Sequence, residues 1–220
     1  MKHPLIEIFY TKKPDGNMNF QEFRQNFLEK HKISRKPIVV EQIHGKKVIL
    51  VDKNYNQKQK ADGMITNDKN VVLISRMSDC IPVLFLDPLK KAAAVIHAGR
   101  EGTFQNISGE AVQKFISEFN SDPKNILVEI GPGICGDCYE VSREMVDFVR
   151  DNFGEKFLTG GANNRNINLK AINEKHLVDS GILPENISNV GICTRCGDKN
   201  YFSYRKNPEE GNFATMIYLK

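Results

Sequence analysis

No apolar run in the sequence is long enough to cross a bilayer: stretches such as residues 81–86 fall far short of the roughly 20 residues that a spanning helix needs. Net charge is also small, because 31 Lys and Arg against 27 Asp and Glu leave +4, so neither a nucleic-acid nor a membrane partner is expected. Cysteine is scarce. There are five cysteines, an odd number, and the sequence shows no signal-peptide pattern. Both observations argue against a secreted disulfide scaffold and predict a cytoplasmic protein.

The remaining composition is that of a globular protein, with 40% hydrophobic and 26% charged residues, and we expect one domain over residues 1–220. Apolar spacing predicts helices near 20–28, 108–119 with Ser108 as N-cap, 142–153 and 168–177. Short β-branched stretches predict strands at 37–43, 47–51, 71–75, 81–86, 92–97, 126–130, 187–193 and 214–219. Because strands and helices do not alternate strictly, the pattern favours an α+β fold with mixed sheets.

Three metal-competent side chains, His44, Cys80 and His97, each stand where a predicted strand meets a loop. Two imidazoles and one thiolate would bind Zn²⁺ and leave a fourth position for water or substrate. Spacing alone does not bring the three together in space. The alternative is that Cys80 is a small buried residue and His97 a hydrogen-bonded core histidine.

The other four cysteines form two C-x-x-C pairs, Cys135 with Cys138 and Cys193 with Cys196. Two such pairs are a recognised Cys₄ zinc pattern, but the 54 residues between them exceed the spacing of a zinc ribbon. The pairs could still meet in the fold. Buried thiols and a redox-active C-x-x-C are the alternatives.

Tyr201-Phe202-Ser203-Tyr204-Arg205 combines aromatic rings, a hydroxyl and a guanidinium, which suits a planar ring and an anion. An ordinary amphipathic strand is the alternative for this stretch. The glycines that follow His97 suit either a backbone anion site or a plain turn.

Six stretches in this order resemble the YfiH/YlmD-type laccase-domain family, also described as multicopper polyphenol oxidoreductases. They are QIHG at 42–45, ADGMIT at 61–66, SDCIPVLFLDP at 78–88, AAVIHAG at 93–99, IGPGICGDCYEV at 130–141 and CTRCGDKNYFSYR at 193–205. The resemblance implies a sandwich of mixed β-sheets flanked by helices (α/β/β/α). One departure concerns phosphate binding: Arg100-Glu101 stands where the family usually has Trp-Arg.

The resemblance also implies a function. Members look like zinc-dependent purine nucleoside phosphorylases that act on adenosine, inosine and methylthioadenosine and deaminate adenosine, so the partners would be a purine nucleoside and phosphate, in a monomer or homodimer. It carries the metal site onto His44, Cys80 and His97. We add Asp79 as a catalytic or ligand-supporting group. The candidates for substrate binding are Gln42, Tyr139, Ser203 and Arg205.

Three other functions stay open at this point. The older family name implies copper-dependent oxidation of phenols, and a His₂Cys set with nearby Met77 is also a blue-copper arrangement. Alternatively, Cys80 could be a nucleophile with His97 as its base, which would make the protein a hydrolase. A binding module without enzymatic activity is the last class.

Overall fold

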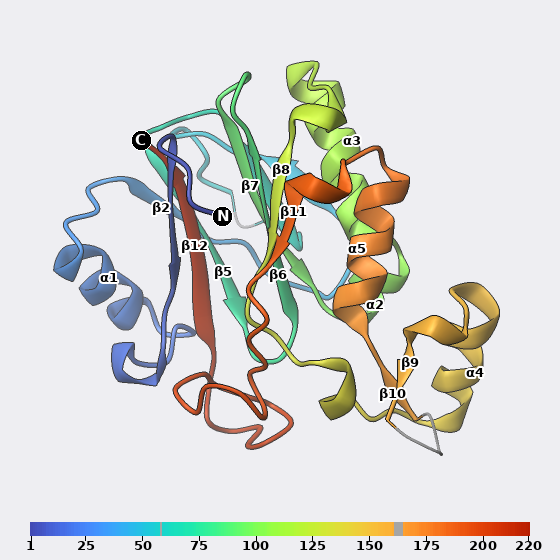
Figure 1. The fold of residues 1–220 in the computed structure, drawn as a ribbon. Helices are drawn as coiled ribbons and strands as arrows, with labels where there is room; N and C mark the ends of the chain where they lie inside the picture. The colour runs from blue at the N-terminus through green and yellow to red at the C-terminus, as the bar shows by residue number, and fades with distance from the viewer. Residues whose placement is uncertain (58, 161–164) are drawn as a thin grey trace.

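Two mixed β-sheets lie face to face in the computed structural model, which describes residues 1–57, 59–160 and 165–220 (Figure 1). The four-stranded sheet has the order β1 (Ile6–Tyr10), β12 (Phe213–Leu219), β5 (Val71–Met77) and β2 (Lys36–Ile38). The six-stranded sheet has the order β11 (Ile187–Asn189), β8 (Leu127–Ile130), β6 (Ile81–Asp87), β7 (Ala92–Ala98), β4 (Gly63–Thr66) and β3 (Val48–Leu50). The pairs β2/β5, β3/β4 and β8/β11 are parallel, and the other pairs within these two sheets are antiparallel.

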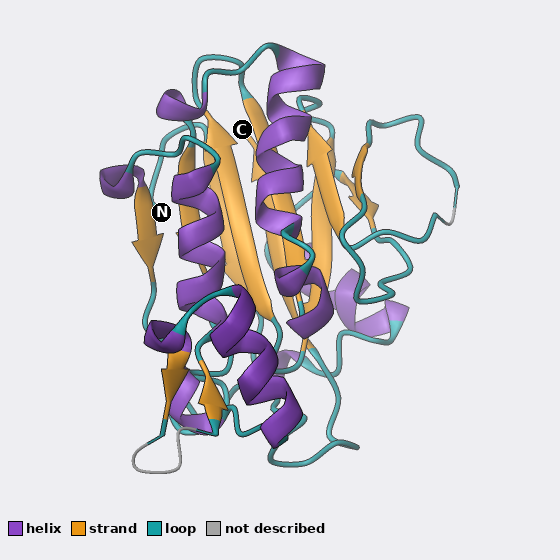
Figure 2. Cartoon of the chain, turned by 90° about the vertical axis from the view of Figure 1, so that its right-hand side faces the viewer, coloured by secondary structure: helices purple, strands orange, loops and turns teal. Residues whose placement is uncertain are grey.

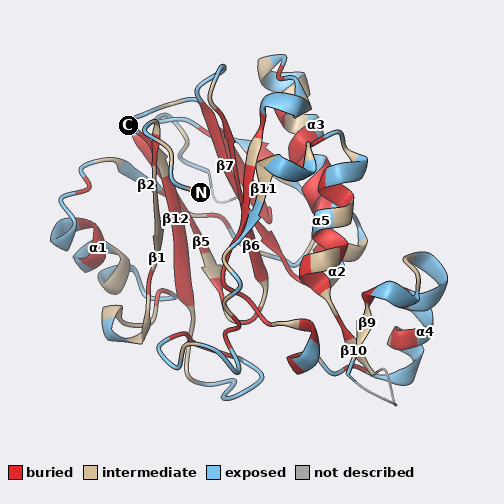
Figure 3. Ribbon diagram, in the orientation of Figure 1, coloured by how far each residue is buried: buried red, intermediate tan, exposed pale blue. Residues whose placement is uncertain are grey.

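Strand alternation explains why the central strands are apolar on both faces. On β6, Leu84 and Leu86 pack between the two sheets, whereas Val83 and Phe85 pack toward the helices. Figure 3 shows the same burial along most of both sheets. The face of each sheet that points away from the other sheet is therefore apolar too, and it must be buried by other elements.

Helices provide that cover. α3 (Ile107–Phe119) and α5 (Leu169–Asp179) share a core with the six-stranded sheet and lie across it in Figure 2. α1 (Gln21–Lys30) packs on the four-stranded sheet. The smaller elements are α2 (Arg100–Phe104), α4 (Arg143–Asn152) and a hairpin of β9 (Leu158–Thr159) with β10 (Asn166–Ile167). The layers are thus helix, sheet, sheet and helix, which confirms the predicted fold class.

The structure corrects several predicted elements. The strand predicted at 37–43 ends at Ile38, so Gln42 and His44 lie in a loop, and the one predicted at 187–193 ends at Asn189. β1 and β4 were not predicted; β4 has only four residues and begins with glycine, a residue depleted in strands. Asn106, not Ser108, caps α3, because its side chain accepts the Gly109 N–H at 2.9 Å.

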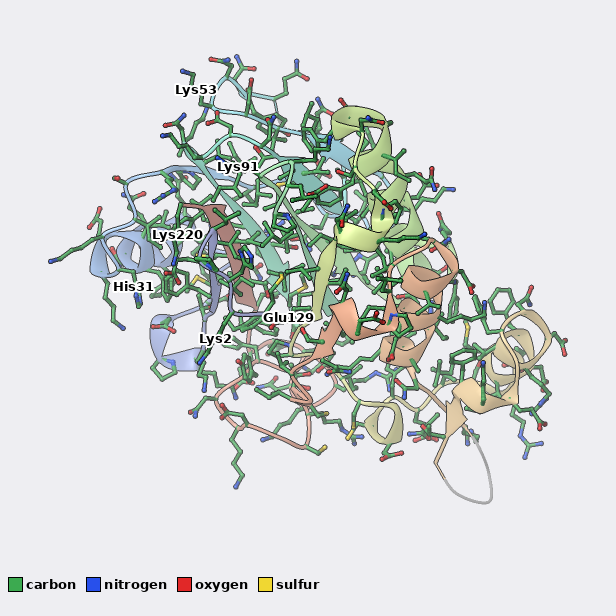
Figure 4. The ribbon with its side chains drawn as sticks, turned by 45° about the horizontal axis from the view of Figure 1, so that its top comes forward. Lys2, His31, Lys53, Lys91, Glu129 and Lys220 are labelled. Carbon is green, nitrogen blue, oxygen red and sulfur yellow. The ribbon has the colours of Figure 1, made fainter. Side chains whose placement is uncertain are left out.

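Three exposed lysines are labelled in Figure 4: Lys53 lies in the loop after β3, Lys91 in the turn between β6 and β7, and Lys220 directly after β12. Within the described ranges, none of the helices is both long and apolar enough to span a membrane.

Candidate metal centre and cavity

His44, Cys80 and His97 come together at one end of the sandwich. Their potential ligand atoms all lie within 4.8 Å of one another, and the two imidazole rings are 4.8 Å apart between centroids. Cys80 stands where the chain crosses from β5 in one sheet to β6 in the other, and His97 is on β7, the neighbour of β6. We refer to these three residues as the three-ligand cluster.

The backbone around the cluster is shaped to bring the side chains this close. His44 and Asp79, which precedes Cys80, have positive φ angles of 60° and 75°. Gly99 leaves room where a Cβ would lie 3.0 Å from the His44 ring and 3.2 Å from the Cys80 sulfur. A side chain at position 99 would therefore press directly on two of the three ligands.

Asp62 orients the cluster from behind, and sequence reasoning did not select it. Its buried carboxylate accepts hydrogen bonds from His97 Nδ1 at 2.9 Å and from the backbone N–H groups of His44 at 2.9 Å and Gly45 at 2.7 Å. Burial opposes ionisation, but these bonds outweigh it and lower the pKa of Asp62. Because Nδ1 is engaged, Nε2 is the His97 nitrogen available to a metal. The one available signal was the ADGMIT stretch, which contains Asp62.

Cys80 and His97 each favour the charged form of the other. Burial raises the pKa of Cys80, but the nearby His97 and the hydrogen bonds from His44 and His97 outweigh it and lower this pKa to about 6. Burial likewise lowers the pKa of His97, but Cys80 and Asp62 raise it to about 9. The thiolate, which is the form that ligates metals and attacks electrophiles, is thus available near neutral pH.

The donor set fits a zinc ion. Two imidazoles and one thiolate match the ligands that Zn²⁺ takes in catalytic sites, where a fourth position is left for water or substrate. Asp62 supplies the carboxylate–histidine pair that accompanies such ligands. His44 and Cys80 also line a cavity of about 610 Å³, so a ligand can reach the metal position.

The cavity has the size and the lining of a small-molecule site. The Arg205 guanidinium lies 4.5 Å from the centroid of the Tyr139 ring, and both residues line the cavity. Arg100 lines it too, but its guanidinium pairs with Glu101 at 2.8 Å. At the cavity wall, the charge of Arg100 is thus partly neutralised by Glu101, while Arg205 stacks on the Tyr139 ring.

Asp79 lines the cavity, yet its carboxylate is already engaged. One oxygen accepts the Thr194 hydroxyl at 2.6 Å, and the other accepts the Arg205 backbone N–H at 2.7 Å. Asp79 therefore ties the loop that carries Cys80 to the loop that carries Arg205.

Gln42 and Ser203 are not among the residues that line this cavity. The Gln42 amide is paired with the Arg76 backbone, donating to its C=O at 2.9 Å and accepting from its N–H at 3.0 Å. Gln42 instead lines a smaller hollow of about 180 Å³, which His44, Cys80 and His97 line as well. Ser203 is buried, and its Oγ has no hydrogen-bond partner among the described residues.

The fold and the cluster define a candidate metalloenzyme of the α+β class, with three potential protein ligands, of which His44 and Cys80 line the cavity. The sequence profile of the family described as multi-copper polyphenol oxidoreductase laccase matches residues 10–220. The chain therefore belongs to this family.

Relatives and solved structures agree with that assignment. The chain is 35% identical over 173 residues to a Bacillus subtilis protein named purine nucleoside phosphorylase YlmD; the match covers 76% of the chain and 62% of that protein. It is 31% identical over 224 residues to a purine nucleoside phosphorylase of Campylobacter jejuni, with 100% of the chain and 95% of that protein covered. The crystal structure of the Bacillus licheniformis protein YfiH superimposes with a TM-score of 0.82 at 28% identity, covering 90% of this chain and 80% of that one.

Proposed function

We propose that this chain is a zinc-dependent purine nucleoside phosphorylase that acts on adenosine, inosine and methylthioadenosine and also deaminates adenosine. The observation that carries the proposal is the convergence of His44, Cys80 and His97, two of which, His44 and Cys80, line a cavity large enough for a nucleoside. The names of the relatives favour the same activity.

His44, Cys80 and His97 would hold the zinc ion, and Asp62 would keep His97 in the tautomer that ligates it. When bound, zinc supplies a Lewis acid that polarises an oxygen atom of a substrate or lowers the pKa of water. Cys80 favours this role because its environment stabilises the thiolate.

Arg205 is our candidate for binding phosphate. In phosphorolysis a phosphate oxygen bonds to C1′ of the ribose while the bond from C1′ to the purine nitrogen breaks, so a cation must hold the phosphate beside the sugar. Arg100 is less suited because Glu101 already neutralises part of its charge. Asp79 positions Arg205 by holding its backbone N–H.

The purine would lie against aromatic side chains of the same cavity. Tyr139 stacks on Arg205 and lines the cavity, as does Tyr204. Burial raises the pKa of Tyr139, so its hydroxyl stays protonated and can donate a hydrogen bond to the base. Gln42 and Ser203, which lie outside this cavity, would act by supporting Arg76 and the 203–207 turn.

Incubation with adenosine and phosphate tests the proposal, with products separated by chromatography. Adenine that forms only when phosphate is present reports phosphorolysis, inosine reports deamination, and hypoxanthine formed under the same condition reports both in sequence. We expect Cys80→Ala to abolish all three products together with one zinc equivalent, and the exposed neighbour variant Lys46→Ala to retain them. Full turnover in Cys80→Ala, or a zinc-loaded protein that converts no nucleoside, would contradict the proposal.

The family description and the His₂Cys set keep copper-dependent phenol oxidation as a second candidate. Two observations weaken it. In the described part of the chain, the second group of potential metal ligands consists of four thiols and contains no histidine. His31 belongs to neither group, and its ring packs on the Phe27 ring with 4.3 Å between centroids. Elemental analysis of protein made without added metal distinguishes the two, since zinc and a colourless solution favour the phosphorylase.

A hydrolase with Cys80 as nucleophile and His97 as base is favoured by the same thiolate. Alkylation kinetics separate this function from metal binding. A Cys80 that stays unreactive until a chelator is added is a metal ligand. Fast alkylation under saturating zinc would indicate a cysteine nucleophile.

A further inference from the structure

The four cysteines outside the three-ligand cluster meet at a second place. Cys135 precedes the turn η3 (Gly136–Cys138), which follows β8, and Cys138 is its last residue, while Cys193 and Cys196 lie in the loop after β11. Their four sulfur atoms all lie within 4.8 Å of one another, and the Cys135 and Cys196 sulfurs are 3.8 Å apart. We refer to these residues as the four-thiol cluster.

The spacing of the sulfurs suits a metal ion better than a disulfide. Four sulfurs placed tetrahedrally at about 2.3 Å from a zinc ion lie about 3.8 Å from one another. A disulfide needs an S–S distance of about 2.05 Å, and all four cysteines have free thiols in the structure. The arrangement therefore has the size of a ZnS₄ tetrahedron.

The surrounding backbone donates to sulfur, as expected around thiolates. The N–H groups of Cys135 and Cys196 point at Cys193 Sγ, at 3.3 Å and 3.5 Å. Gly197 permits this tight turn, because a Cβ there would lie 2.6 Å from the Cys193 carbonyl oxygen. Each such bond stabilises a negative sulfur, which is the form that binds metal.

Basic side chains stand next to the cluster. The buried Lys170 ammonium donates to the Ile192 carbonyl at 2.8 Å, immediately before Cys193. The Arg195 guanidinium donates to the Cys138 carbonyl at 3.1 Å and so crosses from one C-x-x-C pair to the other. A zinc ion with four thiolates carries a net charge of −2, which these two cations would offset.

We propose that Cys135, Cys138, Cys193 and Cys196 form a structural tetrathiolate zinc site that fastens the η3 turn to the loop after β11. Four protein ligands leave no position for substrate, which is the pattern of structural zinc sites. The site stands apart from the proposed function, since it uses none of the residues of the three-ligand cluster.

The proposal is tested by measuring the zinc content of a variant that lacks one ligand of the three-ligand cluster but keeps all four thiols. The full chain and Cys80→Ser are purified after growth with zinc, and their zinc content and X-ray absorption are measured. We expect two zinc ions per unaltered chain and one in Cys80→Ser, where the remaining ion has sulfur neighbours only, at about 2.3 Å. Adding Cys196→Ser should remove that ion, whereas adding Lys199→Ser, an exposed position on the same loop, should keep it.

Several results would overturn the site. They are a Cys80→Ser chain without zinc whose other four thiols alkylate freely, a disulfide among these four cysteines, iron in place of zinc, or nitrogen and oxygen neighbours around the remaining ion. If the double variant fails to fold, the single variant and the unaltered chain still decide. None of these outcomes bears on phosphorolysis, because Cys80→Ser is used here only to count metal.

Discussion

The three-ligand cluster and the four-thiol cluster both contain sulfur but differ in ligand number and access. His44 and Cys80 line the cavity of about 610 Å³, whereas the four thiols are not among its lining residues. Three protein ligands leave one metal position open for water or substrate, which suits a catalytic site. Four protein ligands fill all positions, which suits a structural metal site. The comparison predicts that substitutions in the three-ligand cluster reduce turnover, whereas substitutions in the four-thiol cluster reduce the stability of the fold.

The largest expected effect is on stability. Cys196→Ser should lower the free energy of unfolding by about 4 kcal/mol, and hence Tm by on the order of 10 °C, because a lost structural metal belongs to the most destabilising class of substitutions. Thermal unfolding followed by circular dichroism measures the shift. Lys199→Ser is the matched control and should unfold like the unaltered chain. An unchanged Tm in zinc-depleted Cys196→Ser would remove the distinction between the clusters.

His44→Asn should show the opposite pattern. Asn tolerates the positive φ of 60° at this position but replaces the imidazole, so kcat/KM for adenosine should fall at least about a hundredfold. His44 is exposed, so Tm should change by only about 2 °C. His31→Asn, at an exposed histidine outside the cluster, should leave kcat/KM unchanged and lower Tm only slightly through the lost packing on Phe27. A large loss of Tm with retained turnover would assign a structural role to the three-ligand cluster.

Asp62→Asn should weaken the metal site without removing a ligand. The amide keeps the shape of the carboxylate but loses the charge that faces His97 Nδ1, so zinc affinity should fall about 10- to 100-fold. Competition with a chromophoric chelator measures the affinity. Asp87→Asn is a close match, since Asp87 is also buried and accepts backbone N–H groups at a turn, and it should retain zinc. Equal losses in both variants would mean that Asp62 acts only through folding.

The proximity of His44, Cys80 and His97 could be predicted only through the resemblance of their three stretches to the family's motifs, because spacing alone does not bring the residues together. Asp62 was missed because a lone aspartate has no signal of its own; its role depends on the antiparallel pairing of β4 with β7, which brings the residue before β4 beside His97. Gln42 and Ser203 stand close to site residues in the chain, but the Gln42 amide is paired with the Arg76 backbone and Ser203 is buried, so neither lines the cavity of about 610 Å³.

The four-thiol cluster shows a different limit. Its two C-x-x-C pairs are plain in the sequence, yet the 54 residues between them match no ribbon. The pairs meet because β8 and β11 run parallel, with Val128 opposite Ile187 and Ile130 opposite Asn189, so the loops that leave both strands emerge side by side. A parallel pairing between strands so far apart in the chain depends on α4 and α5 folding between them, which local patterns do not reveal.

The smallest expected effect concerns the hydrogen bond that joins the two regions. Asp79 precedes Cys80 and accepts the hydroxyl of Thr194, which follows Cys193, at 2.6 Å. Thr194→Val keeps the shape and removes the bond to a charged acceptor, so the free energy of unfolding should fall by about 1.5 kcal/mol and Tm by about 3 to 6 °C. KM should rise a few-fold with little change in kcat, because Asp79 also holds the Arg205 backbone at the cavity.

Thr215→Val is the matched control for Thr194→Val. Its buried hydroxyl has no partner among the described residues, so the same substitution there should be neutral or stabilising. Equal behaviour of the two valine variants would mean that the two regions fold and function independently of this bond.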